Sequence, residues 1–183
     1  WLENPLRMKI TLRKGVMFPA KAGVMKAREL VADDVVFSFK RLSSSPKANK
    51  TYFDYVKDVT APDKYTVVFE MSKFNAEWDY RFGYGYYSGI IPKEVVDAGA
   101  ANWKNVNGTG PFKLKTWDKG DRVELERDAN FWDKSKAVAL QNITFRFIND
   151  PQAQVAALQS GGVGAMGGIG AARLYSPLQN HKR

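Results

Sequence analysis

The sequence predicts a mixed α/β fold in which short sheets carry flanking helices. Three observations support this class: alternating polar and apolar residues at Arg7–Leu12, helical spacing of apolar residues at Ala32–Leu42, and several paired β-rich runs. Hydrophobic residues make up 44% and aromatic residues 13% of the 183 residues, which is ordinary for a chain that buries a core. We therefore expect one folded domain or two small ones.

In the first half, the strand predicted at Arg7–Leu12 leads into a turn and a loop without clear periodicity. The next stretch, Ala32–Leu42, has acidic residues at its start and basic residues at its end, as a helix favours. Two β-rich runs, Tyr55–Thr60 and Tyr65–Met71, are separated by Ala-Pro-Asp-Lys and predict a hairpin. Short helices are expected at Asn75–Phe82 and Pro92–Asp97.

A second β-rich region begins at Pro111 and turns at Lys119-Gly120-Asp121. It is followed by a helix in PQAQVAALQSG, which turns Val155 and Leu158 toward the core and ends at Gly161. The residues expected to face the core from its strands are Phe112, Leu114, Val123, Leu125, Ile143, Phe145 and Phe147.

Composition restricts the chemistry. Cysteine is absent and the single histidine is His181, so this chain offers neither a thiolate nor a histidine triad, and no metal site or cofactor is expected. The carboxylate pair Asp33 and Asp34 is consistent with a helix start, and no nucleophile is evident near any acidic pair. No apolar stretch has the length of a membrane helix. We expect no enzyme.

The net charge of +9 raises nucleic-acid binding as an alternative. The lysines and arginines are scattered and alternate with acids, which favours a solvated mixed-charge surface. The chain has no initiator methionine and no recognisable signal peptide. We therefore expect it to begin inside a longer gene product.

Two glycine-rich stretches raise the question of a phosphate site. Gly162–Gly167 fits G-x-G-x-x-G, but a predicted helix precedes it and no acidic residue follows Asp150. Gly108–Pro111 lacks the Gly-Lys-Ser/Thr of a phosphate loop, and its proline removes an amide donor. We interpret the second stretch as a corner of the scaffold.

The aromatic run Trp78–Tyr87 alternates with glycines and ends beside Ser88. One interpretation is a core element. The other is a binding wall, because tyrosine and tryptophan offer flat apolar area with a polar tip.

Six motifs follow one another in an order that belongs to a known family. They are LRKGVMF (Leu12–Phe18), ADDVVFSFKRL (Ala32–Leu42), YTVVFEM (Tyr65–Met71), IIPKEVV (Ile90–Val96), GTGPFKLKTWDKGDRVELERDANFWD (Gly108–Asp133) and ITFRFINDPQAQVAALQSG (Ile143–Gly161). The chain resembles the bacterial extracellular solute-binding proteins of family 5, the peptide/nickel class of ABC-transporter receptors. It departs from their pattern at Gly162-Val163-Gly164, where the family usually has Glu-Val-Asp.

The resemblance implies an α/β, periplasmic-binding-protein type II-like lobe with a mixed sheet and flanking helices, present here in part. Residues 1–107 would be a lobe-one part that includes the extra subdomain. Residues 108–160 would return to the main lobe-one sheet and its following helix, and residues 161–183 would be a glycine-rich tail, disordered or truncated. The second lobe would lie outside this chain.

The resemblance also implies a function without covalent chemistry. The expected role is capture of oligopeptides or dipeptides in the periplasm, or on a lipid anchor outside the cell, and delivery to a membrane permease. A monomer that binds no nucleic acid is expected, and an oligosaccharide or an opine is the alternative ligand. The expected ligand contacts are Tyr52, Tyr55, Trp78, Tyr84, Tyr86, Tyr87, Ser88 and Thr109.

Overall fold

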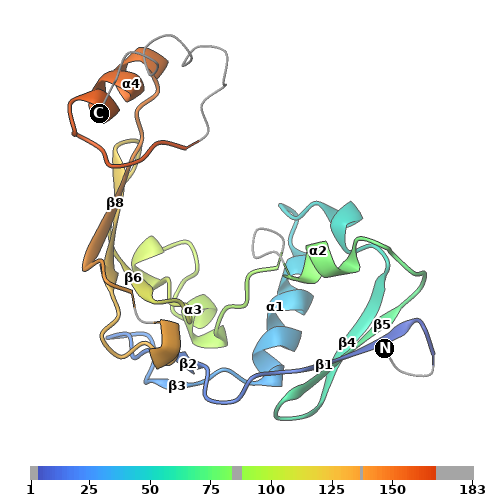
Figure 1. Cartoon of the computed structure of the whole chain (residues 1–183). Coiled ribbons are helices and arrows are strands. Elements are labelled where there is room, and N and C mark those ends of the chain that lie inside the picture. Colours follow the sequence, from blue (N-terminus) through green and yellow to red (C-terminus); the bar gives the residue numbers. More distant parts are fainter. Residues whose placement is uncertain (1–3, 84–87, 137, 168–183) are drawn as a thin grey trace.

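The computed structural model describes residues 4–83, 88–136 and 138–167. Its strands are β1 (Arg7–Thr11), β2 (Met17–Phe18), β3 (Arg28–Glu29), β4 (Val56–Asp63), β5 (Thr66–Met71), β6 (Phe112–Asp118), β7 (Arg122–Arg127) and β8 (Asn142–Arg146). Its helices are α1 (Ala32–Ser44), α2 (Trp78–Gly83), α3 (Lys93–Asp97) and α4 (Pro151–Gln159), with single 3₁₀ turns at Lys50–Tyr52, Trp103–Asn105 and Lys134–Lys136. The mixed α/β class is confirmed (Figure 1).

The first sheet has the order β1-β5-β4 and is antiparallel throughout. Its central strand β5 reads TVVFEM, and five of its six residues are buried, because it lies between two strands and under α1. The strand β4 contains Pro62, which falls at a register shift between Thr60 and Asp63. Proline is tolerated there because β4 is an edge strand. The predicted hairpin is thus confirmed.

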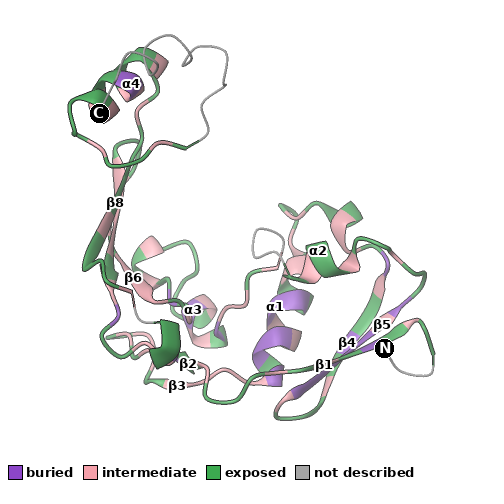
Figure 2. Cartoon of the chain, in the orientation of Figure 1, coloured by how far each residue is buried: buried purple, intermediate pink, exposed green. Residues whose placement is uncertain are grey.

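Helix α1 covers this sheet and completes the main core. Its buried residues include Val35 and Phe39, which pack with Val67 and Phe69 of β5. Figure 2 shows that buried positions concentrate on α1 and on the strands beneath it. The helix starts where predicted, because Asp34 accepts a hydrogen bond from the Val31 amide at 3.0 Å and so satisfies an end that lacks helical partners.

A two-stranded sheet joins segments that sequence periodicity left as a loop. Met17 pairs with Glu29, and Phe18 pairs with Arg28. These strands are only two residues long, so no alternation pattern can reveal them. Phe18 is nevertheless fully buried, at 0% exposure.

The third sheet has the order β6-β7-β8, with α4 beyond β8 (Figure 1). Val155 of α4 is buried as predicted and Leu158 is half-buried. The prediction that Phe145 and Phe147 face a core is wrong, since they are 53% and 49% exposed. Both side chains line an open hollow between β8 and the segment 163–167. Within that same part, no helix has the length and apolar character needed to span a membrane.

Candidate ligand-binding surface

The ring of Phe82, at the end of α2, is the centre of an aromatic cluster. Its centroid lies 4.6 Å from Phe69, 5.4 Å from Phe39, 5.9 Å from Phe53 and 6.3 Å from Tyr55. Such separations and tilts are favourable for aromatic pairs. Phe82 therefore anchors α2 on the core formed by α1 and β5.

Four of the predicted ligand contacts lie near this cluster. Trp78 is half-buried and packs against the same core. Tyr52 is half-buried, and its ring lies 4.5 Å from the Arg81 guanidinium, a cation–π distance. The Ser88 hydroxyl donates a hydrogen bond to the Phe82 carbonyl at 2.9 Å. Tyr84, Tyr86 and Tyr87 lie outside the described residues.

Tyr55, the fourth of these residues, lies inside the core. Its side chain is 0% exposed, so in this structure Tyr55 does not reach the surface where a ligand would bind. Its hydroxyl is buried and has no hydrogen-bond partner among the described residues. Burial raises the pKa of this phenol, because the charged form is poorly solvated there. Sequence reasoning identified an aromatic cluster but could not separate its buried members from its exposed ones.

A small apolar hollow of about 150 Å³ opens beside the cluster. It lies between the strands β1 and β5, helix α1 and the segment that carries Phe82 and Ser88. Ser88 is the only hydroxyl-bearing residue among its described lining residues. Such a hollow can receive an apolar group but offers few polar contacts for orienting one.

Thr109 lies at a separate place, the corner before β6. Its carbonyl accepts a hydrogen bond from the Trp132 indole N–H at 2.8 Å, and the Pro111 carbonyl accepts one from the Asp128 amide at 2.8 Å. The segment after β7 therefore folds back onto the Gly-Thr-Gly-Pro turn. The two sequence blocks GTGPF and ERDANFWD are therefore in contact in the fold.

The N-terminal half is bound to the same corner. Arg13 forms an ion pair with Asp133 at 3.2 Å, and its guanidinium lies 5.4 Å from the Trp132 ring centroid. The Asp133 pKa is lowered, first by the hydrogen bond from the Ser135 hydroxyl. These contacts support the interpretation of the turn as a scaffold corner.

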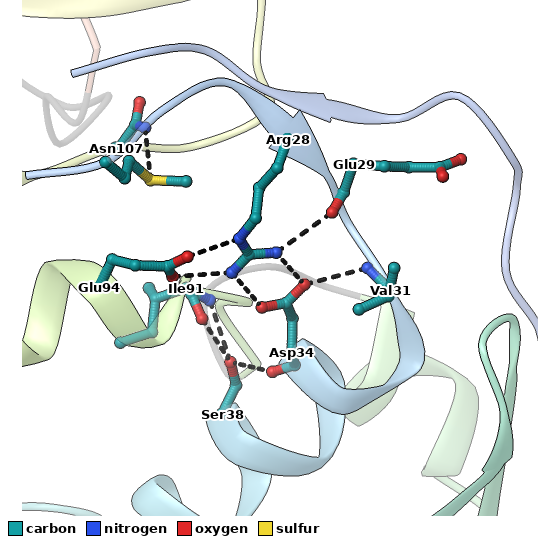
Figure 3. Close-up of polar contacts among 9 residues, drawn as sticks. Arg28, Glu29, Val31, Asp34, Ser38, Ile91, Glu94 and Asn107 are labelled. Carbon is teal, nitrogen blue, oxygen red and sulfur yellow. Dashed lines mark hydrogen bonds and ion pairs between the residues drawn. The ribbon is translucent and has the colours of Figure 1, made fainter.

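Arg28 forms a polar junction that sequence reasoning did not identify (Figure 3). Its Nε and Nη2 donate to Glu94 at 2.6 and 2.8 Å, and both terminal nitrogens donate to Asp34 at 2.9 and 2.8 Å. The fifth donor reaches the Glu29 carbonyl at 3.1 Å. All five N–H groups of the guanidinium are therefore used.

The junction joins three elements. Arg28 lies on β3, Asp34 in the first turn of α1 and Glu94 on α3, 66 positions away in sequence. Ser38 extends the contact, because its hydroxyl accepts from the Ile91 amide at 3.0 Å. The Arg28 hydrogen bond lowers the pKa of Glu94 to about 2, while the two carboxylates raise the Arg28 pKa. No local pattern could have revealed a pair so far apart in the chain.

The elements of this chain superpose on solved receptors from several bacteria. A DppA from Helicobacter pylori, solved with the peptide STSA, matches with a TM-score of 0.73 at 28% identity, covering 86% of this chain and 34% of that one. AppA from Bacillus subtilis, solved with a nonapeptide, matches with a TM-score of 0.72 at 26% identity, covering 88% and 32%. MoaA from Agrobacterium strain R10, solved with mannopinic acid, gives 0.71 at 25% identity, covering 86% and 31%. The fold is therefore that of a periplasmic binding protein.

Sequence comparison gives the same assignment. The family model described as bacterial extracellular solute-binding proteins, family 5 Middle, matches residues 1–182, and the chain belongs to this family. The oligopeptide-binding protein AppA of Bacillus subtilis is 28% identical over 177 residues, and the dipeptide-binding protein of Escherichia coli is 28% identical over 167 residues. The alignments cover 88% and 81% of this chain but only 30% and 31% of the relatives. The chain thus spans about a third of their length.

The family consists of solute-binding proteins rather than enzymes, and its members work in the periplasm or outside the cell. The described residues contain no group of acidic or histidine side chains that could hold a metal ion.

Proposed function

We propose that this chain is part of the first lobe of the substrate-binding component of an ABC importer. The whole protein captures oligopeptides or dipeptides outside the cytoplasmic membrane, in the periplasm or on a lipid anchor, and delivers them to a membrane permease. The observation that carries this proposal is the family match over residues 1–182, together with relatives named as oligopeptide- and dipeptide-binding proteins. Capture needs no covalent step, because closure of two lobes around a ligand is a shift between conformations.

The ligand-facing part of this lobe is proposed to be the surface around α2. Tyr52, Trp78 and Ser88 lie near the Phe82 cluster, and their partial exposure supports this role. Tyr84, Tyr86 and Tyr87 remain candidate contacts from the sequence. Because Tyr55 is completely buried, we assign it to the core that supports this surface and not to direct ligand contact. Thr109 remains a candidate contact from the sequence and lies at the separate corner before β6.

The proposed division of the chain follows its sheets. Residues 1–107 contain the β1-β5-β4 sheet and the β2-β3 pair, and residues 108–160 contain the β6-β7-β8 sheet and α4. We place the boundary at the Gly108–Pro111 corner, because it lies between the 3₁₀ turn Trp103–Asn105 and strand β6. Residues 161–183 form the third segment, the glycine-rich tail.

An opine is the second candidate ligand. MoaA, solved with mannopinic acid, is about as similar in fold and sequence as the peptide receptors are. Peptides and opines share carboxylate and amine groups, so fold similarity alone does not separate them.

Native mass spectrometry of the whole purified protein tests the proposal. We expect co-purified peptides, released on unfolding, and binding of a mixed di- to pentapeptide library by calorimetry. A Tyr52→Ala variant should weaken peptide binding by about tenfold, as for a partly buried aromatic contact. The matched control is Trp117→Ala, which removes an exposed aromatic ring from strand β6 of the β6-β7-β8 sheet.

Other results would reject the peptide assignment. Retention of mannopinic acid, with no peptide bound at millimolar concentration, would favour the opine receptor. Binding of random DNA that falls steeply with salt, with no small ligand, would favour the nucleic-acid alternative.

A further inference from the structure

Helix α1 buries a small polar side chain among its apolar ones. Ser38 is 5% exposed and lies next to the buried Phe39. Its hydroxyl donates a hydrogen bond to the Asp34 carbonyl at 2.7 Å, four residues earlier in the same helix. Such back-bonding does not strengthen a helix, so the partner that gives this serine a role lies outside α1.

That partner is the backbone of Ile91. The Ser38 oxygen accepts a hydrogen bond from the Ile91 amide at 3.0 Å, across 53 positions of sequence (Figure 3). Three residues after Ile91, Glu94 accepts hydrogen bonds from Arg28, which also donates to Asp34. This part of the chain is therefore attached to the start of α1 at two points.

The residues just before these attachments, 88–91, have few other restraints. They belong to no helix or strand, and within the described part of the chain none of them forms a backbone–backbone hydrogen bond. Gly89 is exposed and has open space where a side chain would be, so packing does not fix its backbone. Ile90 packs against the core, and the Ser88 hydroxyl donates to the Phe82 carbonyl. The position of the segment 88–91 therefore depends on a few side-chain contacts.

We propose that Ser38 and Arg28 are positioning residues for ligand capture. They hold the segment 88–91 against α1, so that Ser88 is already in place when it meets the ligand. A contact that is ordered before binding avoids the free-energy cost of ordering it during binding. Ser38 is buried, and Arg28 uses all five N–H donors within the protein, so both act through the segment and not by touching the ligand. This inference rests on the proposed function, in which Ser88 is a ligand contact.

A positioning role and a direct contact have different kinetic signatures. If a fraction of the molecules holds the segment out of place, only the remaining fraction can bind. The association rate then falls by that fraction, while the dissociation rate is unchanged. Loss of a direct contact mainly raises the dissociation rate. A merely structural role changes neither rate in a protein that is folded at the temperature of measurement.

Stopped-flow tryptophan fluorescence of the whole protein separates these cases. The probe is the member of the di- to pentapeptide library that the wild-type protein binds most tightly. Ser38→Ala should lower the association rate about fivefold and leave the dissociation rate within about twofold. Glu94→Gln weakens the second attachment and should also lower the association rate. Tyr52→Ala removes a proposed direct contact and should instead raise the dissociation rate.

Two control variants lie in the same half of the chain. Ser43→Ala removes an exposed hydroxyl that donates to the Lys40 carbonyl of α1, and it should change neither rate. Val59→Ala shortens a side chain of β4 that is 4% exposed, so it should lower the stability and leave both rates unchanged. Hydrogen exchange of the Ile91 amide reports the attachment itself, and we expect exchange at least about tenfold faster in Ser38→Ala.

The outcomes distinguish this inference from the proposed function. Unchanged rates in Ser38→Ala, with or without faster exchange at Ile91, would overturn the inference and leave the proposed function standing. A higher dissociation rate with an unchanged association rate would contradict it too, because Ser38 would then act in the bound state. A wild-type protein that binds no peptide of the library would reject the proposed function, and this inference with it.

Discussion

At the scale of single residues, the junction at Arg28 depends on a planar group with five fixed donors. Its side chain is 31% exposed, yet every N–H is bonded, to carboxylates on two helices and to one carbonyl. Lysine could not reproduce this arrangement, because an ammonium group is a point charge with three donors and no fork. The residue therefore positions α1 and α3 relative to each other.

Arg28→Lys should lower the free energy of unfolding by about 1–3 kcal/mol, because bidentate bonds are lost and two carboxylates lose partners. Urea denaturation followed by circular dichroism measures this difference. The matched control is Arg122→Lys, since Arg122 also pairs with three carboxylates but is 42% exposed. The control should cost at most about 1 kcal/mol. Equal losses in the two variants would show that Arg28 is an ordinary surface ion pair.

The same junction makes a prediction about acid stability. The Glu94 pKa is lowered from 4.5 to about 2, so the folded state holds this carboxylate in its charged form. Its contribution to stability is complete above the unfolded pKa near 4.5 and is lost as pH falls toward 2. Glu94→Gln should remove this part of the decline, which urea titrations between pH 5 and pH 2 measure. An unchanged decline would contradict the assigned role of Glu94.

Tyr55 provides the opposite case, a polar atom whose removal should be harmless. Its buried hydroxyl has no partner among the described residues, so it contributes a desolvation cost without a hydrogen bond. Tyr55→Phe should leave stability unchanged or raise it by up to about 1 kcal/mol. Tyr65→Phe is the comparison, because the Tyr65 hydroxyl donates to Glu29 at 2.9 Å. A loss above about 1 kcal/mol in Tyr55→Phe would reveal a partner for this hydroxyl.

At the scale of elements, α2 shows how a short helix is held by aromatic side chains that pack against the core. The helix has six residues, too few for stability on its own, and none of them is fully buried. Phe82 compensates by contacting four aromatic rings of α1, β5 and the segment before β4. Any ligand-facing role of Trp78 depends on this anchor.

Phe82→Ala should therefore destabilise the chain by about 2 kcal/mol, because the ring is half-buried and four aromatic neighbours lose a packing partner. The amides of α2 should exchange faster than those of β5, since the anchor is lost while the sheet remains. Val106→Ala, at a position that is 49% exposed, should change stability by less than about 0.5 kcal/mol. If α2 keeps its protection in the alanine variant, another contact must hold it.

Elements also show what a sequence can predict. The helix α1, the β4–β5 hairpin and the helix α4 follow from periodicity, turn residues and caps, and all were found close to their predicted bounds. The β2–β3 pair was missed, because two-residue strands are specified by their partners rather than by their own pattern. The alternating apolar residues from Ile143 to Phe147 suggested burial for Phe145 and Phe147, but alternation shows only that they share a face.

At the scale of the whole molecule, family membership and fold support each other. The motifs from Leu12 to Gly161 predicted a solute-binding protein, and the match to residues 1–182 confirms the family. The candidate site was less accessible to sequence reasoning. Its residues lie in two places, around Phe82 and at the corner before β6, and only the fold reveals that separation.

The sequence by itself determined the family, the fold class and the main helices and strands, because these depend on local patterns and ordered motifs. Only the tertiary structure decided that Tyr55 is buried, that Arg28 joins three elements, and that the outer edge of β8 has no partner strand among the described residues. Each of these depends on contacts between positions far apart in the chain. Burial and pairing are properties of such contacts, and a linear pattern does not specify which residues will supply them.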